Sequence, residues 1–185
     1  MAGVTLEYNA AAALAKINAA AGTLESPRTM FLDMGEFLLA STERRFSTQT
    51  APDGSPWKAL SPAYQKRKRK NKNRILVLEG YLKKLLRYQA SNEALLLGSD
   101  RVYAAIHQLG GTIDIAARSQ QAYFKQTKKG VGNRFVKKSR SNFAQRVTIG
   151  PYTITMPARP YLGVSAQDEE RLIEIATYHL EKSLS

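Results

Sequence analysis

The sequence predicts a small α+β domain, with helices at both ends and a little antiparallel sheet between them. Apolar residues recur at helical spacing near the N-terminus and at the C-terminal end, whereas short segments bounded by glycine and proline lie between them. The chain has 185 residues, which suits one domain over 1–185. We expect N-terminal helices, a β-hairpin, a C-terminal helix and a long basic loop, the last as a flexible insertion over 112–146.

Two helices are expected in the N-terminal part. Residues 7–21 are rich in alanine, the best helix former, and Gly22 would end this helix. A second helix begins at Ser26-Pro27, with serine as the N-cap and proline at the first helical position, and runs to about Arg45. Its apolar residues are interpreted as core packing: Met30, Phe31, Met34, Phe37, Leu38 and Phe46.

The middle of the chain combines turns with further helices. In 47–62 the sequence Pro52-Asp53-Gly54 predicts a tight turn, and Trp57 would anchor this turn on the core. Ser61-Pro62 opens a helix that carries the basic run 66–70. Another helix is expected over 75–86, because its leucines fall on one helical face.

The second half alternates between short segments and turns. Residues 93–98 have the pattern of a buried strand, and 102–109 fit either a short helix or a strand. The segments 147–149 and 152–155 flank Gly150-Pro151 and are expected to pair as a hairpin. Ser165 with Asp168 predicts a capping box at the start of the final helix.

The charge distribution points to an anionic partner. Lys and Arg number 28 against 15 Asp and Glu, which gives a net charge of +13. No acidic residue lies between Asp53 and Glu79 or between Asp114 and Asp168, whereas acidic residues crowd the C-terminal segment. Two such tracts favour a surface that binds an anionic partner, or the acidic face of a neighbouring subunit, over loops that are merely solvated.

The basic patch expected to bind this partner or DNA has two parts. Its members are Lys66, Arg67, Lys68, Arg69, Lys70, Lys128, Lys129, Lys137, Lys138 and Arg140. A basic run is also often a solvated helix face or a mobile arm. The aromatic residues among the lysines of 123–143 could stack on single-stranded bases, or could only tie a loop down.

No motif for catalysis, a cofactor or a metal ion is found. The chain lacks a phosphate-binding loop, a nucleophile elbow and cysteine, and His107 and His179 lie too far apart in sequence for typical zinc spacing. A magnesium-dependent nuclease would need clustered carboxylates, and only Asp53 and Glu79 flank the first basic run. No apolar run approaches the roughly 20 residues of a membrane helix, and the N-terminus lacks signal-peptide features. We expect a soluble, intracellular protein that is not an enzyme and has no cofactor, membrane partner or small-molecule substrate.

Five short segments form an ordered set of landmarks: Arg45-Phe46, then 52–57 (PDGSPW), 75–82 (ILVLEGYL), 103–111 (YAAIHQLGG) and 157–163 (PARPYLG). Together they resemble the phage virion morphogenesis, or tail completion, family of Mu-like and P2-like phages and prophages. Glu79 departs from the pattern, because a small hydroxyl residue is more usual there. The resemblance implies a structural protein of the virion neck or tail, present in the bacterial host cytoplasm during assembly, that completes the tail or joins it to the head.

The resemblance also implies a homo-oligomeric ring that binds other phage neck and tail proteins, with non-specific contact to genome DNA as a further expectation. The acidic C-terminal segment and the basic tracts would favour head-to-tail contacts between subunits. The candidate interface or anchor residues are Trp57, Tyr103, His107, Gln108, Arg159 and Tyr161. For the aromatic-proline segments at 56–57 and 160–161, anchoring of a loop to the core is the alternative. For His107, a hydrogen-bonded structural role is favoured over a catalytic one. A basic nucleic-acid-binding module is the alternative function.

Overall fold

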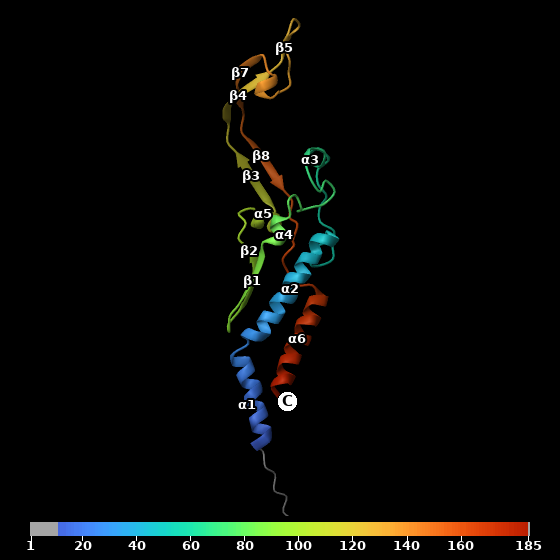
Figure 1. The fold of residues 1–185 in the computed structure, drawn as a ribbon, viewed down its shortest axis with the longest axis vertical. Coiled ribbons are helices and arrows are strands. Elements are labelled where there is room, and N and C mark those ends of the chain that lie inside the picture. Colours follow the sequence, from blue (N-terminus) through green and yellow to red (C-terminus); the bar gives the residue numbers. More distant parts are fainter. Residues whose placement is uncertain (1–10, 185) are drawn as a thin grey trace, which may run out of the picture. The chain divides into compact units, whose positions relative to one another are not determined.

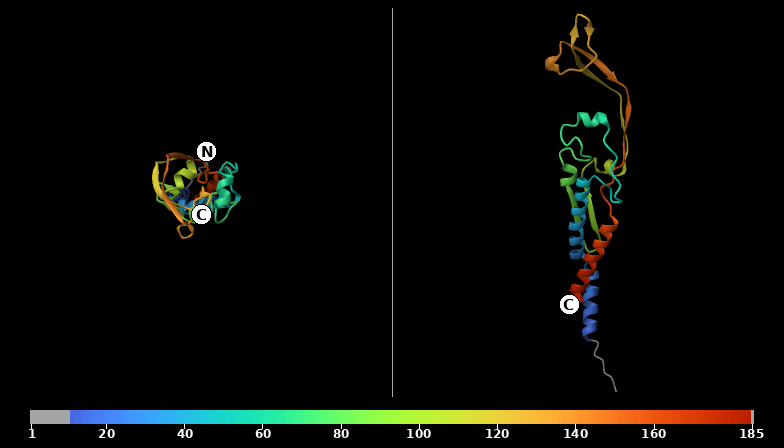
Figure 2. Two further views of the ribbon diagram at one scale, coloured as in Figure 1. Left: turned by 90° about the horizontal axis from the view of Figure 1, so that it is seen from above. Right: turned by 90° about the vertical axis from the view of Figure 1, so that its right-hand side faces the viewer.

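A computed structural model describes residues 11–184, which fall into two compact units (Figures 1 and 2). Unit 1 contains the described residues up to Leu109 together with those from Pro157 onward, and unit 2 is Gly110–Met156. The described residues form six α-helices and eight strands, and every paired strand runs antiparallel to its partner. The predicted α+β class with a C-terminal helix is therefore confirmed.

Unit 1 contains three long helices. They are α1 (Ala11–Glu25), α2 (Arg28–Thr48) and α6 (Ala166–Leu184), and α6 packs against both others. Gly22 does not end α1, because an isolated glycine weakens a helix by only about 1 kcal/mol relative to alanine. At the start of α2, Pro27 rather than Ser26 occupies the N-cap position, and no side chain caps this end.

The hairpin of β1 (Leu86–Ala90) and β2 (Leu95–Ser99) packs against α2. The prediction of a strand at 93–98 is confirmed by β2, but no residue of β2 is buried and Leu96 is 64% exposed. The prediction of a helix over 75–86 is wrong. Only α4 (Tyr81–Lys84) is helical there, because Leu76 and Gly80 have positive φ angles of 57° and 84° and the chain enters β1 at Leu86. Leu82 and Leu86 are nevertheless buried.

Two short helices complete unit 1. The first, α3 (Pro62–Arg67), begins as predicted at Ser61, whose hydroxyl accepts a hydrogen bond from the backbone N–H of Tyr64. It ends at Arg67, so the helix carries only the first part of the basic run. The second, α5 (Ala104–Leu109), shows that the helical alternative for 102–109 is the one adopted.

All five landmark segments contribute to the core of unit 1. The Phe46 ring packs against the rings of Trp57 and Tyr161, with centroids 5.4 and 5.5 Å apart. Around them lie Ala51, Leu82, Leu86 and Ala104, with Leu39, Ile75, Leu76, Val77 and Leu162 at the edge. Segments far apart in the sequence therefore converge on one aromatic centre.

Unit 2 contains one long two-stranded ribbon. Strand β3 (Gly111–Ile115) pairs with β8 (Tyr152–Met156), and β4 (Arg118–Phe124) pairs with β7 (Phe143–Ile149). The register is unbroken, since Ile115 faces Tyr152 and, three residues further along each strand, Arg118 faces Ile149. Pro151 lies in the gap between the two paired stretches, where its missing N–H cannot join a ladder.

The predicted hairpin between 147–149 and 152–155 is wrong. Both segments belong to the same side of the ribbon, as parts of β7 and β8, and each pairs with an earlier strand. A two-residue hairpin turn needs a positive φ angle, which proline cannot adopt, and Gly150 does not have one.

Residues 112–146 form secondary structure in place of the expected long loop. Besides β3 and β4, they include β5 (Gln126–Thr127), β6 (Gly130–Val131) and the 3₁₀ turn η1 (Lys138–Arg140). The Asn142 side chain bonds both the N–H and the C=O of Gln126, at 2.7 and 2.8 Å, and the rings of Phe124 and Phe135 lie 5.3 Å apart. The flexibility of this segment stays a prediction.

Gly35 sets how closely α2 approaches the β1–β2 hairpin. A Cβ atom at this position would lie 2.8 Å from Cε2 of Tyr88 and 2.9 Å from Cδ1 of Leu95. We expect Gly35→Ala to lower the free energy of unfolding by about 1–3 kcal/mol relative to Gly22→Ala, because overpacking opposes the gain in helix propensity that both variants share. Urea denaturation measures the difference.

Gly22→Ala is the matched control, since nothing lies within 4 Å of a Cβ at Gly22 in α1. This variant should be more stable than the wild type by up to about 1 kcal/mol. Equal stability gains in the two variants would show that the hairpin does not pack closely on Gly35.

Candidate functional site

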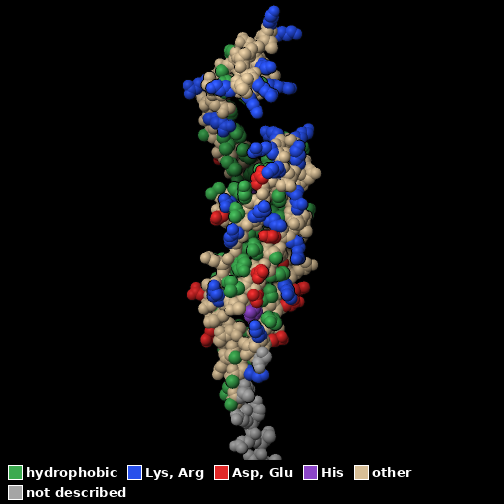
Figure 3. Space-filling model, in the orientation of Figure 1, with side chains coloured by type: hydrophobic (Ala, Val, Ile, Leu, Met, Phe, Trp, Pro, Cys, Tyr) green, Lys and Arg blue, Asp and Glu red, His purple; other side chains and the backbone are tan. Residues whose placement is uncertain are grey.

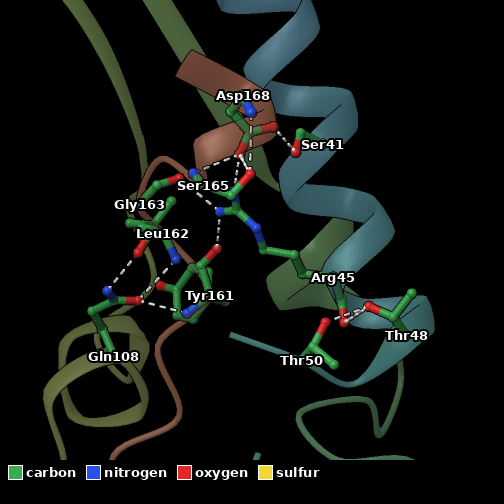
Figure 4. A network of polar contacts seen from close by, with 10 residues as sticks. All are labelled: Ser41, Arg45, Thr48, Thr50, Gln108, Tyr161, Leu162, Gly163, Ser165 and Asp168. Carbon is green, nitrogen blue, oxygen red and sulfur yellow. Dashed lines mark hydrogen bonds and ion pairs between the residues drawn. The ribbon is translucent and has the colours of Figure 1, made fainter. Parts of the chain in front are cut away.

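Residues 157–163, which lead into α6, are held by side chains from several other parts of unit 1. We call them the anchor segment; Figure 4 shows the side of its network that faces α2, α5 and α6. Trp57 Nε1–H donates a hydrogen bond of 2.7 Å to the carbonyl of Pro160. Tyr161 is 1% exposed, and its hydroxyl donates to the carbonyl of Ala104 at 3.4 Å. The packing of the Trp57 and Tyr161 rings and the hydrogen bonds that they donate to backbone carbonyls therefore fix the centre of the segment together.

Gln108 of α5 binds the backbone of the anchor segment through both ends of its amide. Its Oε1 accepts hydrogen bonds from the N–H groups of Tyr161 and Leu162, at 2.9 and 3.0 Å. Its Nε2 donates to the carbonyl of Leu162 at 2.9 Å (Figure 4). One side chain thus supplies three backbone bonds that an irregular segment would otherwise lack.

Arg159 joins the anchor segment to the turn after Trp57. The guanidinium donates to the carbonyls of Lys58 and Ala59, at 2.7 and 3.2 Å, and the backbone N–H donates to the carbonyl of His107 at 2.8 Å. Burial lowers the pKa of Arg159 from its ordinary value. Burial, with the nearby charge of Arg159, also lowers the pKa of His107, so its imidazole is neutral at pH 7.

Arg45 of α2 ties the end of the anchor segment to α6. Its guanidinium donates to the carbonyls of Tyr161 and Gly163, at 3.0 and 2.7 Å. The same group forms a buried ion pair with Asp168 (Figure 4). The cation is therefore compensated by one carboxylate and two carbonyl oxygens, as a buried charge requires.

Asp168 has two structural roles at the start of α6. It accepts bonds from the N–H and hydroxyl of Ser165, at 2.9 and 2.8 Å, while Ser165 Oγ accepts the N–H of Asp168, which confirms the predicted capping box. Ser41 of α2 donates a further bond of 2.6 Å. Burial by itself raises the pKa of the Asp168 carboxyl, but the bonds from Ser41 and Ser165 and the charge of Arg45 hold it below its usual value.

The six candidate interface or anchor residues lie in or around this network. Trp57, Arg159 and Tyr161 are buried, His107 and Gln108 are half-buried, and Tyr103 is 37% exposed with its ring against that of His107. For Trp57 and Tyr161, the structure supports the anchoring alternative. Contact of any of the six with another protein stays a prediction. The network also includes Arg45 and Asp168, whose pairing no sequence spacing indicates.

Lys68 must be removed from the predicted basic patch. It is 5% exposed, and its ammonium donates to the carbonyls of Asn71, Arg74 and Val77, which orders the loop after α3. Burial lowers the pKa of this group. The other four members of the run are exposed: Lys66, Arg67, Arg69 and Lys70. Among them Lys70 is paired with Glu79 at 2.9 Å.

The basic residues of unit 2 form a larger set than the sequence patch included. The predicted members Lys128, Lys129, Lys137, Lys138 and Arg140 are all exposed. Four further exposed cations lie in the same region: Arg118, Lys125, Arg134 and Arg146. Lys and Arg side chains project from the region that carries β4, β5 and β7 (Figure 3). The absence of acidic residues from 115–167 was the sequence signal for this surface.

Between residues 11 and 184, no three His, Cys, Asp or Glu side chains are grouped so as to hold a metal ion. No helix in that range combines the length and apolar character needed to cross a membrane. The candidate sites are the anchor network of unit 1 and the cationic surface of unit 2.

Asp168→Asn tests the importance of the buried ion pair. We expect a loss of about 3 kcal/mol in the free energy of unfolding at pH 7, because the guanidinium stays buried without its counter-ion. The folded-state pKa lies below the unfolded one, so the contribution of Asp168 is fully present above about pH 5 and is lost as the pH falls through the folded pKa. Urea unfolding at pH 7 and at pH 3 should show the wild type and the variant converging at the lower pH.

Glu174→Gln serves as the control, since Glu174 forms an exposed ion pair with Arg171 on the same helix. This variant should lose less than about 1 kcal/mol at pH 7. A loss for Asp168→Asn as small as that for the control would contradict the structural importance of the pair.

Comparison with known proteins links the sequence to phage assembly. The sequence profile of the phage virion morphogenesis family matches residues 8–181. "Putative capsid assembly protein G" of Escherichia phage Mu is 34% identical over 122 residues, which are 62% of this chain and 78% of that protein. No solved structure matches the chain. With five ordered landmarks converging on one core and a family match over nearly its whole length, the chain belongs to the phage virion morphogenesis family and is a phage assembly protein.

Proposed function

We propose that the protein is a non-enzymatic structural component that completes the phage tail or joins it to the head, as part of an oligomeric ring in the virion neck. The observation that carries this proposal is the family match over residues 8–181. The name of the phage Mu relative, which refers to capsid assembly, supports a role near the head. Its partners would be other neck and tail proteins, met in the bacterial cytoplasm during assembly.

The use of polar groups in unit 1 supports a structural role. The side chains of Arg45, Gln108 and Arg159 all bind backbone carbonyls of the same chain, and Asp168 binds Arg45 and two serines. These bonds fix the path of the chain, and they use the hydrogen-bonding capacity of the side chains within unit 1. A unit whose polar groups are bonded internally suits a structural subunit.

One face of α1 provides a surface for self-association. Leu14, Ile17 and Leu24 are 55%, 61% and 60% exposed, and their spacing places them on one side of the helix. An apolar stripe left in water is typical of a protein contact. We propose that a second copy covers this stripe, and that repetition of the contact by rotation closes the ring.

The proposed role is tested in a prophage that lacks this gene. Heads and tails should accumulate unjoined in electron micrographs after induction, and expression of the wild-type chain should restore complete particles. Complete, infectious particles in the absence of the gene would contradict the proposed function.

Self-association is tested by the double variant Leu14→Lys and Ile17→Lys. The variant should have a lower molar mass by light scattering than the wild type, because charged side chains replace the apolar contact. The matched control is Val102→Lys with Leu109→Lys, since these side chains are 98% and 76% exposed outside the stripe. A wild-type mass equal to one chain would contradict the ring, and an unchanged mass of the stripe variant would contradict the α1 contact.

A further inference from the structure

We propose that residues 118–149 of unit 2, here called the basic tip, bind double-stranded DNA through its phosphate backbone. The inference goes beyond the assembly role and does not depend on ring formation. It rests on the sign of the charge, on the lack of internal partners for that charge, and on the shape and composition of the ribbon.

The charge of the basic tip has a single sign. Nine Lys and Arg residues lie in 118–149, and no Asp or Glu does. Asp114 of β3 is the one acidic residue of unit 2, and its carboxylate accepts a hydrogen bond from the Thr153 hydroxyl at 2.7 Å. A net charge of +9 in so short a segment attracts a polyanion and repels a second basic surface.

These cations have no partner in the described part of the chain. None of the nine side chains forms an ion pair or donates a hydrogen bond there. In unit 1, by contrast, Lys68 is bound to carbonyls, and Lys70 and Lys83 are paired with Glu79 and Glu43. The cations of the tip therefore remain available to neutralise phosphates, which releases the counter-ions of the DNA.

The ribbon has dimensions and side chains that suit a DNA groove. Two paired strands lie about 5 Å apart, and the major groove, roughly 12 Å wide, admits a two-stranded ribbon. Between the cations, β4 and β7 expose short polar side chains that can bond phosphates, sugars or base edges: Ser119, Gln120, Gln121, Gln145 and Thr148.

Stacking on single strands fits the structure less well. Of the aromatic residues in the tip, Phe124 is buried, Tyr123 and Phe143 are half-buried, and only Phe135 is well exposed, at 63%. The Phe135 ring already packs against Phe124. A single-strand platform uses successive free aromatic faces, so the tip favours a duplex.

An acidic protein face is also a weaker fit than DNA. The cores of protein interfaces are depleted in lysine and enriched in aromatic residues. Among the large apolar side chains of the tip, only Val131 and Phe135 are strongly exposed. The tip thus has the composition of a phosphate-binding surface.

The experiment measures binding of the full chain to a fluorescent 24-base-pair duplex by anisotropy, between 50 and 200 mM salt. If about six of the nine cations contact phosphates, the affinity should fall by about 10³-fold over this range. A tip variant carries Lys128→Gln, Lys129→Gln, Lys137→Gln and Lys138→Gln. It should bind at least about tenfold more weakly at 100 mM salt, and the slope of log affinity against log salt should become shallower by about 3 to 4.

The control variant carries Lys66→Gln, Arg67→Gln, Arg69→Gln and Lys72→Gln, all exposed in unit 1, and loses the same net charge. It should stay within about threefold of the wild type. Circular dichroism and molar mass should match the wild type for both variants. If the tip variant binds DNA more weakly but keeps the molar mass of the wild type, the loss of affinity does not come from a change in self-association. A failure of the proposed ring would instead appear as a wild-type mass equal to one chain.

Three results would overturn the proposal. The first is no duplex binding at 50 mM salt, and the second is an equal loss of affinity in the tip and control variants. The third is tighter binding of a 24-nucleotide single strand than of the duplex. A tip variant that keeps its affinity for DNA but has a lower molar mass would instead assign the tip to an acidic face of a second copy.

Discussion

The buried guanidinium of Arg45 is the interaction that joins α2, the anchor segment and α6. A cation removed from water needs a counter-ion and acceptors for its remaining N–H groups, and Arg45 finds these in Asp168 and in the carbonyls of Tyr161 and Gly163. These partners come from α6 and from the anchor segment, so the guanidinium ties α2 to both. The aromatic centre and the Gln108 bonds hold the same segment at Tyr161 and Leu162.

Local signals in the sequence predicted the elements that depend on a few neighbouring residues. The capping box of Ser165 and Asp168, the N-cap at Ser61 and the tight turn that includes Asp53 and Gly54 all form as expected. Each depends on bonds that span only a few residues, which spacing and residue type encode directly.

Contacts between distant residues explain what the sequence did not predict. The leucines of 75–86 fit one helix by their spacing, but they reach the core from an irregular segment, the short helix α4 and a strand, where burial matters more than periodicity. The pairing of β4 with β7 joins residues on either side of a basic segment whose composition resembles a loop. Lys68 and Asp168 were recognised as charged, but neither the burial of Lys68 nor the pairing of Asp168 with Arg45 leaves a trace in local sequence.

The unbroken register of the unit 2 ribbon has a consequence for how its length can vary. Because Pro151 interrupts the ladder without adding or removing a residue, the two sides of the ribbon remain matched from Gly111 to Phe124. Deleting two residues from β4 and the two that face them in β7 would shorten each strand by about 7 Å and keep every remaining side chain on its face. Deleting one residue from one strand would reverse the faces beyond that point. The length of the ribbon that carries the basic tip can therefore change during evolution in matched two-residue steps, while unit 1 stays unchanged.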